Sequence, residues 1–383
     1  MDTAKVTPVQ PTIEPERYRT PVRAAVLRDT SAPVAVETVR LRDVGPDELR
    51  VRIDATGVCH SDLSLARGRL AQPTPAVLGH EACGTVLETG AGVDSVRPGD
   101  RVLLLWISPC GNCFFCLQGE PHLCEHGADR SGEPYAIDQH DQPVYPGLGI
   151  GSFAEQTVLR SNAVVPVPPD IPAADAALLG CAVTTGVGAV TKVARVRAGS
   201  SVLVLGLGGV GLCTVIGARL AGARQILAVD RNPARAALAV RLGADEFLPA
   251  DDGLRRAVRT LTGHGADYTF DCVGSAATVR TAWSLARRGG TVCVVGIGGK
   301  DELVQFSALE LFHFARTLVG CVGGSLDAGA DLPRYFEWIR NGTLEVSALA
   351  SGTAGIDDVE RCFADLEQGR AVRTLLLPNR SLE

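Results

Sequence analysis

The sequence lacks an apolar run long enough to cross a membrane and a basic run long enough to follow a phosphate backbone. No uninterrupted apolar stretch approaches the roughly 20 residues of a spanning helix. The net charge is -6, which does not favour nucleic acid as a partner. The N-terminal stretch is polar and proline-rich, unlike a secretory signal. We therefore expect a soluble cytoplasmic protein, with no membrane or nucleic-acid partner and a loose N-terminal arm over residues 1–20.

The sequence also lacks the spacing of a disulfide framework, although it contains 12 cysteines. Four of them form a tight C-x2-C-x2-C-x7-C run, at Cys110, Cys113, Cys116 and Cys124. Four thiolates at this spacing can close a tetrahedral metal shell with no position left for substrate. The lobe around them, residues 108–126, has almost no apolar core, so the metal would supply its folding energy. An iron–sulfur cluster or free thiols are the alternatives, and the spacing favours zinc.

The chain length and the hydrophobic pattern predict two domains of unequal type. A chain of 383 residues with 46% hydrophobic and 21% charged residues is globular and too long for one ordinary core. In residues 48–55, apolar side chains alternate with charged ones, as in a half-buried strand. Similar short strands and glycine-rich turns continue to Leu105. We expect a compact, barrel-like antiparallel unit in this part of the chain.

The composition changes at Ser201, where an apolar run of strand length opens into Gly206-x-Gly208-x-x-Gly211 and then a helical stretch. A second strand follows and is closed by Asp230. This order of strand, glycines, helix and carboxylate predicts a dinucleotide site with the pyrophosphate at the helix N-terminus. Asp230 would accept hydrogen bonds from the adenosine ribose and repel a 2′-phosphate, which favours NAD over NADP. Arg231 beside it could tolerate a phosphate.

Further strands and helices alternate after Asp230 and predict a parallel, doubly wound sheet. We expect helices over 252–261 and 276–288, and strands over 266–273, 291–297 and 317–322. After residue 324 the chain is expected to leave this sheet. Helices over 333–342 and 356–369 and a last strand over 371–377 would then return to the N-terminal domain.

Three soft metal ligands remain, and they are scattered in sequence: Cys59, His80 and Cys181. Two thiolates and one imidazole are the donors of a catalytic zinc site that keeps one position open. Taken singly, a cysteine is more often a small buried side chain and a histidine more often a hydrogen-bonded core residue. The order of the motifs decides between these interpretations.

The motifs GVCHSD, GHEACG, GCAVTTGVGA, GLGGVG and VRT, with the four-cysteine lobe, resemble those of the zinc-dependent medium-chain alcohol dehydrogenases over almost the whole chain. The resemblance implies an α/β fold with a Rossmann doubly wound parallel sheet and a mainly antiparallel, GroES-like catalytic domain. It implies a catalytic domain over 21–182 that includes the lobe, an NAD-binding domain over 183–322, and a return to the catalytic domain over 323–383.

The resemblance also implies residue roles. Cys59, His80 and Cys181 match the catalytic zinc ligands, the four lobe cysteines match the structural zinc ligands, and Glu81 matches a carboxylate behind the catalytic metal. Ser61 matches the hydroxyl that takes the alcohol proton. Trp106 matches a position that lines the substrate pocket, although it could be an ordinary core aromatic. Positions that match cofactor contacts are His60, Thr185, Gly206, Gly208, Gly209, Val210, Gly211, Asp230, Arg235 and Arg373.

The resemblance implies two zinc ions per chain, NAD as cofactor, and hydride transfer between a primary alcohol or its aldehyde and NAD through a zinc-bound alkoxide. Ser64 replaces the histidine that usually passes the proton to solvent, so the relay is either shorter or uses His60. We expect a homodimer joined through the cofactor domains. His122, His126, His140, His264 and His313 have no partner that the sequence identifies.

Other functions remain open within the same fold. A dehydrogenase of S-hydroxymethyl thiol adducts is the first alternative, although Ala128 replaces the arginine of members that use glutathione. A nicotinoprotein would keep its NAD(H) bound through turnover. A catalytically idle NAD-binding protein belongs to a different class, and the intact ligand set argues against it.

Overall fold

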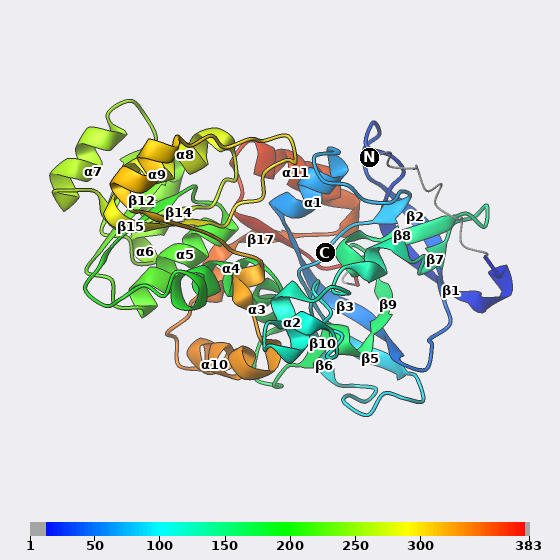
Figure 1. Cartoon of the computed structure of the whole chain (residues 1–383). Helices are drawn as coiled ribbons and strands as arrows, with labels where there is room; N and C mark the ends of the chain where they lie inside the picture. The colour runs from blue at the N-terminus through cyan, green and yellow to red at the C-terminus, as the bar shows by residue number, and fades with distance from the viewer. Residues whose placement is uncertain (1–12, 380–383) are drawn as a thin grey trace.

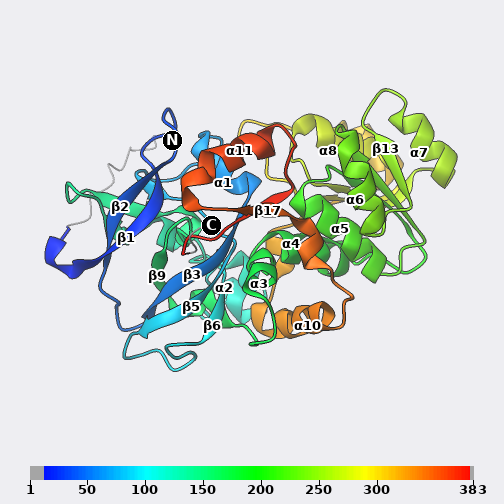
Figure 2. The same ribbon diagram turned by 180° about the vertical axis from the view of Figure 1, so that it is seen from behind.

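The computed structural model describes residues 13–379, which form two units side by side (Figures 1 and 2). The first unit contains a closed barrel in the order β1-β2-β7-β8-β4 and a 7-stranded sheet, β10-β6-β5-β3-β18-β17, with β9 also on β3. The barrel strands are β1 (Tyr18–Leu27), β2 (Ala35–Arg42), β4 (Ala76–Val77), β7 (Ala136–Ile137) and β8 (Pro143–Pro146). Most pairs are antiparallel, and β4/β8 and β17/β18 are the parallel exceptions in this unit.

The 7-stranded sheet combines segments from both ends of the chain. Its strands are β3 (Glu48–Val58), β5 (Ala82–Thr89), β6 (Arg101–Leu104), β9 (Gln156–Arg160), β10 (Val164–Pro166), β17 (Ala350–Ala354) and β18 (Arg373–Leu376). The last strand pairs antiparallel with β3, with Thr374 opposite Val58. The C-terminal segment therefore lies beside the strand that leads to Cys59.

The second unit is a 6-stranded parallel sheet in the order β13-β12-β11-β14-β15-β16. Its strands are β11 (Ser201–Leu205), β12 (Gln225–Asp230), β13 (Glu246–Pro249), β14 (Ala266–Asp271), β15 (Ala286–Val294) and β16 (Thr317–Gly320). Its helices are α5 (Gly209–Leu220), α6 (Ala236–Arg241), α7 (Leu254–Thr262), α8 (Ala276–Leu285) and α9 (Ala308–Phe314). From β11 the chain first adds β12 and β13 on one side and then β14, β15 and β16 on the other, as in doubly wound sheets. The predicted α/β class is confirmed.

The remaining helices precede β11 or follow β16 in the sequence. They are α1 (His60–Ala66), α2 (Phe114–Leu117), α3 (Ala173–Leu179), α4 (Ala182–Gly188), α10 (Ala328–Arg340) and α11 (Val359–Glu367). One apolar core runs from Leu103 in β6 through α3, α4 and α5 to the parallel sheet. Within residues 13–379, no single helix is long and apolar enough to span a membrane, and one bent pair, Ala173–Leu179 with Ala182–Val193, meets the criteria of length and composition only.

The helix predicted over 276–288 is wrong at its C-terminal end. Helix α8 ends at Leu285, and Ala286 already pairs with Ala266 of β14. The register of this pair shifts before Tyr268, and Gly289 has a φ of 67°. A residue with a left-handed backbone conformation interrupts a regular helix, but it is tolerated at an irregularity in a strand. The two arginines before Gly289, which the predicted helix included, therefore belong to β15.

Most of the predicted N-terminal arm, residues 1–20, lies outside the described residues. Its described part contains a single 3-10 turn, Pro15–Arg17, and the first residues of β1.

Candidate active site

Cys59, His80 and Cys181 come together in space, although they lie far apart in sequence. Their ligand atoms all lie within 4.8 Å of one another, and all three side chains are buried. Cys59 precedes α1, His80 precedes β5, and Cys181 precedes α4. The neighbouring Cys181 thiol, together with Arg373 and His80, holds the pKa of Cys59 well below its ordinary value. A low thiol pKa favours the thiolate, which is the form that binds metals.

Asp62 fixes the direction of the His80 ring, a role that the sequence alone did not indicate. Its carboxylate is fully buried, and Oδ1 lies 2.9 Å from His80 Nδ1. The same carboxylate accepts hydrogen bonds from the backbone N–H groups of Gly79, at 3.0 Å, and Cys59, at 3.2 Å. Since Nδ1 is held by Asp62, Nε2 is the nitrogen that faces the two sulfurs. Such a carboxylate behind a histidine ligand orients the ring and raises its basicity.

The donor set fits a zinc ion. Among residues 13–379, His80 Nε2 is a buried nitrogen without a hydrogen-bond partner. Buried polar atoms are normally satisfied, so an orphaned ring nitrogen beside two thiols indicates a missing ligand. Two sulfurs and one imidazole nitrogen leave one position open in a tetrahedral shell, as in catalytic zinc sites.

Glu81 and Arg373 link this cluster to the rest of the molecule. Glu81 is fully buried, and its Oε1 accepts a hydrogen bond from the N–H of Ala182, next to Cys181, at 2.8 Å. Its Oε2 lies 2.9 Å from Arg373 Nε. Burial raises the pKa of Glu81 to about 7, and Arg373 opposes that rise. A methyl group added at Gly209 would lie 2.8 Å from the Arg373 guanidinium carbon. Arg373 therefore contacts both Glu81, which follows the ligand His80, and the glycine-rich turn.

Ser61 and His60 open helix α1 beside the cluster. The Ser61 Oγ lies 3.7 Å from Cys59 Sγ, and the Ser61 N–H points to the same sulfur at 3.5 Å. His60 is exposed, and Ser64, one turn further on, is half-buried. The hydroxyl that was predicted to take the alcohol proton is therefore next to the proposed metal position.

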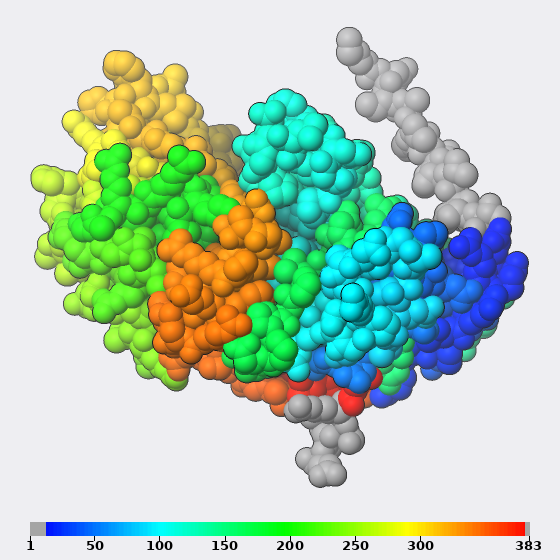
Figure 3. Space-filling view, turned by 90° about the horizontal axis from the view of Figure 1, so that it is seen from below, coloured from blue at the N-terminus to red at the C-terminus, as the bar shows by residue number. Residues whose placement is uncertain are grey.

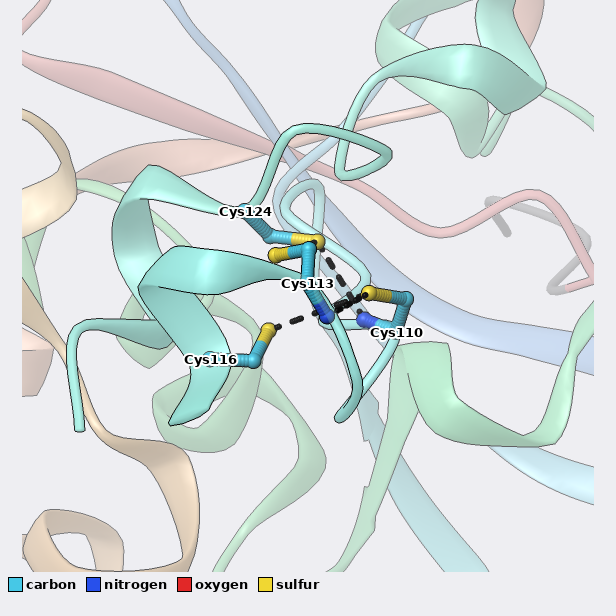
Figure 4. A group of neighbouring side chains, drawn as sticks. All are labelled: Cys110, Cys113, Cys116 and Cys124. Atoms are coloured by element: carbon cyan, nitrogen blue, oxygen red, sulfur yellow. Dashed lines mark hydrogen bonds between the residues drawn. The ribbon is translucent and has the colours of Figure 1, made fainter. Parts of the chain in front are cut away.

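The four cysteines of the lobe also converge (Figure 4). Their sulfurs all lie within 4.8 Å of one another. Backbone N–H groups of Cys110 and Cys113 donate to Cys124 Sγ at 3.2 Å and Cys110 Sγ at 3.3 Å. The apolar side chains of the lobe point outward, with Phe114 64% and Leu117 70% exposed. A segment that buries so little apolar surface needs another source of folding energy, and a four-thiolate metal shell supplies it.

The glycine-rich turn lies between β11 and α5, and each glycine has a separate geometric reason. Gly206 has a φ of 92°, which favours glycine. A methyl group at Gly211 would lie 1.8 Å from the Gly206 carbonyl oxygen, so only glycine allows this close packing. A methyl group at Gly208 would meet nothing within 4 Å, which leaves open space beside the helix N-terminus. This arrangement suits a pyrophosphate.

Asp230 ends β12 and holds this turn. Its Oδ2 accepts a hydrogen bond from the N–H of Leu207 at 2.6 Å, and Oδ1 accepts one from the N–H of Asn232 at 2.8 Å. A carboxylate has further lone pairs that ribose hydroxyls could use. Arg231 is exposed, whereas Arg235 donates to the carbonyls of Gly369, at 2.9 Å, and Ala371, at 2.6 Å. Arg235 thus ties the cofactor sheet to the segment that leads to Arg373.

Helices α4 and α5 cross closely and bring Thr185 toward Val210. A methyl group at Gly186, which follows Thr185, would lie 2.5 Å from the Val210 carbonyl oxygen. Thr185 is buried, and Val210 is half-buried. Because α4 starts directly after Cys181, the crossing places the third metal ligand near the first turn of the cofactor helix.

Trp106 lines a small, partly open cavity. Gly180 and Thr184, on either side of the third metal ligand, also line it. Trp106 follows β6 directly and is half-buried. The indole is therefore neither an enclosed core side chain nor a surface residue.

Two family models match the chain. Residues 45–169 match the alcohol dehydrogenase GroES-like domain, and residues 209–341 match the zinc-binding dehydrogenase domain. The chain belongs to the zinc-dependent alcohol dehydrogenase family. It is therefore an oxidoreductase of a family that acts on small alcohols and aldehydes.

Relatives of this alcohol dehydrogenase match over nearly their whole length. An S-(hydroxymethyl)glutathione dehydrogenase from Photobacterium damsela subsp. piscicida is 34% identical, and the match covers 92% of this chain and 99% of the relative. The benzyl alcohol dehydrogenase structure from Acinetobacter calcoaceticus has a TM-score of 0.87 at 28% identity, covering 94% and 99% of the chains. A zinc-binding alcohol dehydrogenase domain protein from Burkholderia ambifaria has the same TM-score and coverage at 32% identity.

Proposed function

We propose that this alcohol dehydrogenase transfers hydride between a primary alcohol, or its aldehyde, and NAD. The observation that carries the proposal is the buried cluster of Cys59, His80 and Cys181, which Arg373 connects to the glycine-rich turn. Zinc would supply a Lewis acid that favours loss of the alcohol proton, and a nicotinamide would supply the hydride acceptor. The four lobe cysteines would hold a second, structural zinc.

The protein side chains have three tasks in this reaction. Asp62 keeps His80 Nε2 directed at the metal position, and Glu81 fixes the backbone next to Cys181. Ser61 takes the alcohol proton, since its hydroxyl lies beside Cys59 at the start of α1. Burial of all three ligands excludes water from the reacting atoms, which strengthens electrostatic effects there.

The preference for NAD rests on Asp230. A carboxylate at the end of β12 can accept hydrogen bonds from ribose hydroxyls and repels a 2′-phosphate. Arg231 is the opposing feature, because an exposed guanidinium next to it could pair with that phosphate. Comparing kcat/KM for NAD and NADP shows whether the carboxylate of Asp230 or the guanidinium of Arg231 determines the cofactor preference.

The test of the catalytic site is the Cys59→Ser variant. We expect it to contain one zinc per chain instead of two and to lose essentially all alcohol oxidation, because a serine hydroxyl is a poor zinc ligand. Cys83→Ser is the matched control, since Cys83 is also fully buried but lies outside both cysteine clusters. Retained turnover in Cys59→Ser at wild-type zinc content would contradict the proposal.

A second candidate substrate is an S-hydroxymethyl thiol adduct. The relative from Photobacterium damsela carries that activity in its name, and it matches along 92% of this chain. Ala128 argues against glutathione as the thiol. Assays of formaldehyde oxidation with and without glutathione and other low-molecular-weight thiols, beside alcohols alone, separate the two substrates. Retention of NAD(H) through gel filtration would instead indicate a nicotinoprotein.

We also propose that the enzyme is a homodimer joined through its cofactor units. Within residues 13–379, β16 is at the end of the parallel sheet and pairs only with β15. Leu318 of this strand is 43% exposed, and Leu309 and Phe312 of the adjacent α9 are 73% and 84% exposed. An open, apolar strand edge favours pairing with another chain, and a two-fold axis lets the same edge serve both copies.

A further inference from the structure

Two cysteines that belong to neither metal cluster lie close together on the last two strands of the parallel sheet. Cys293 is in β15, opposite Val319 of β16, and Cys321 is the first residue after β16. Since side chains alternate along a strand, Cys321 lies on the same face of the sheet as Val319 and Cys293. The backbone N–H of Cys321 donates to the carbonyl oxygen of Val294 at 2.9 Å, which holds it against β15. The two thiols are therefore diagonal neighbours on adjacent strands.

The two thiols differ in exposure and in their readiness to ionise. Cys293 is buried, whereas Cys321 is half-buried. A hydrogen bond from the Cys293 thiol holds the pKa of Cys321 below its ordinary value. The same interaction, together with burial, raises the pKa of Cys293 far above its ordinary value. A thiolate that solvent can reach, next to a second thiol, is the arrangement of cysteines that oxidise reversibly.

The segment that follows Cys321 packs directly on helix α4. A methyl group at Gly324 would lie 2.0 Å from the Thr184 carbonyl oxygen and 2.9 Å from the Thr185 Cα. Figure 3 shows the chain after β16, coloured orange, against green residues, the colour of the part of the chain that contains α4. Helix α4 begins directly after the metal ligand Cys181. Because close-packed contacts transmit displacements, a movement of Cys321 would reach the helix that carries this ligand at its start.

We propose that Cys293 and Cys321 form a site of reversible oxidation, at which a peroxide joins the two sulfurs in a disulfide and lowers alcohol turnover. The Cys321 thiolate attacks hydrogen peroxide, the O–O bond breaks, hydroxide leaves, and the sulfur becomes a sulfenic acid. The Cys293 thiol then attacks this sulfur, the S–S bond forms, and the hydroxyl leaves as water with the Cys293 proton. The peroxide accepts the two electrons that the sulfurs lose, and a dithiol reverses the step by exchange.

The strand geometry explains why this bond would change the site. A disulfide needs Cα atoms roughly 4.4–6.8 Å apart, whereas diagonal neighbours on adjacent strands are roughly 7–8 Å apart. Cys321 lies just past the end of β16 and can therefore move toward β15 without breaking the ladder. That movement draws Gly324 away from its contacts with Thr184 and Thr185.

The test treats the purified, zinc-loaded enzyme with hydrogen peroxide, at concentrations that leave its zinc content unchanged, and then alkylates the remaining thiols. Trypsin cleaves after lysine and arginine, so it releases residues 289–300, with Cys293 as their only cysteine, and residues 317–334, with Cys321 as theirs. We expect mass spectrometry to find these two peptides linked, and to find them separate after treatment with a dithiol. We expect kcat/KM for benzyl alcohol to fall on oxidation and to recover on reduction. Absence of the linked peptides would overturn the inference.

Cys293→Ser and Cys321→Ser each remove one of the two sulfurs. We expect neither variant to yield the linked peptides or to lose activity reversibly, and Cys293→Ser should accumulate a sulfenic acid at Cys321 that dimedone traps. Cys321→Ser, at the half-buried position, tests the same step if Cys293→Ser does not fold. An equal loss of activity in wild type and in either variant would overturn the inference, because the damage would then lie at other thiols.

Cys272→Ser is the matched control. Cys272 follows β14, is half-buried, and has its Sγ 3.6 Å from the Thr214 hydroxyl oxygen. We expect this variant to form the linked peptides and to lose activity as wild type does. If untreated wild type oxidises no alcohol, the proposed function fails, and the peptide map alone then decides this inference.

Discussion

The contacts of Asp62 give the catalytic site its most direct test at the residue scale. Replacing it with asparagine keeps its shape but removes its charge and sets an amide N–H against the N–H of Cys59. We expect zinc affinity at this site to fall about 10- to 100-fold, as for other residues behind metal-binding histidines. Competition with a chromogenic chelator, followed by kcat/KM at fixed free zinc, measures the change.

Asp129→Asn supplies the control, because Asp129 also contacts a histidine Nδ1, at 3.0 Å, but both residues are exposed. Zinc content and turnover should stay at wild-type values in that variant. Equal zinc affinity in Asp62→Asn and wild type would show that the buried carboxylate does not orient the ligand.

Single residues differ in how well the sequence predicts their roles. Cys59 and Cys181 were predicted to be ligands through the resemblance of the motifs around them to those of a known family. Asp62 was not, since an acid in the first turn of a helix has an ordinary capping role, which it also performs here. His122 had no neighbour that the sequence could identify, because the cavity that it lines also includes Gly323, about 200 positions away in sequence. Such long-range neighbours are not evident in a sequence pattern.

At the scale of elements, two glycines at the turn between β11 and α5 have different predicted roles. We expect Gly211 to be required for folding and Gly208 to be required for cofactor binding. In Gly211→Ala the new methyl group would overlap the Gly206 carbonyl, so we expect the free energy of unfolding to fall by about 1–3 kcal/mol. In Gly208→Ala the methyl group enters open space, and the φ of -73° suits alanine. Its melting temperature should remain close to wild type.

We also expect the Gly211→Ala and Gly208→Ala variants to differ in NAD binding. A methyl group at Gly208 occupies the space that a pyrophosphate would take, so the Kd for NAD should rise about tenfold or more in Gly208→Ala. Isothermal titration calorimetry measures this Kd, and thermal unfolding compares both variants with wild type. Unchanged NAD affinity in a stable Gly208→Ala protein would place the pyrophosphate elsewhere.

The existence and type of an element with a strong local sequence signal were predicted more accurately than the residue at which an element ends. The apolar run of β11 and the glycines after it determine a strand, a turn and a helix within a few residues. The end of α8 depends instead on pairing between Ala286 and Ala266, which lies on another strand. A local pattern does not contain that partner, so the helix was extended through two arginines that favour helix termini.

At the scale of the whole molecule, the site depends on the return of the C-terminal segment. Strand β18 pairs with β3 and carries Arg373, which reaches Glu81 in one unit and the Gly209 turn of the other. Arg235 holds the same segment through the carbonyls of Gly369 and Ala371. The metal cluster and the cofactor turn are thus joined by one buried cation, and the sequence indicated this only through the resemblance of its VRT motif.

The exposed apolar face of α9 and β16 allows the proposed dimer interface to be tested by mutation. Phe312→Glu places a charge on the most exposed apolar side chain of this face, where burying an unpaired charge in a dimer interface would be costly. We expect sedimentation velocity to show a dimer for wild type and a chain of 40.1 kDa for this variant. Leu117→Glu, on the lobe and 70% exposed, is the control and should leave the dimer intact. A wild-type monomer, or a Phe312→Glu dimer as stable as wild type, would contradict an interface at this edge of the sheet.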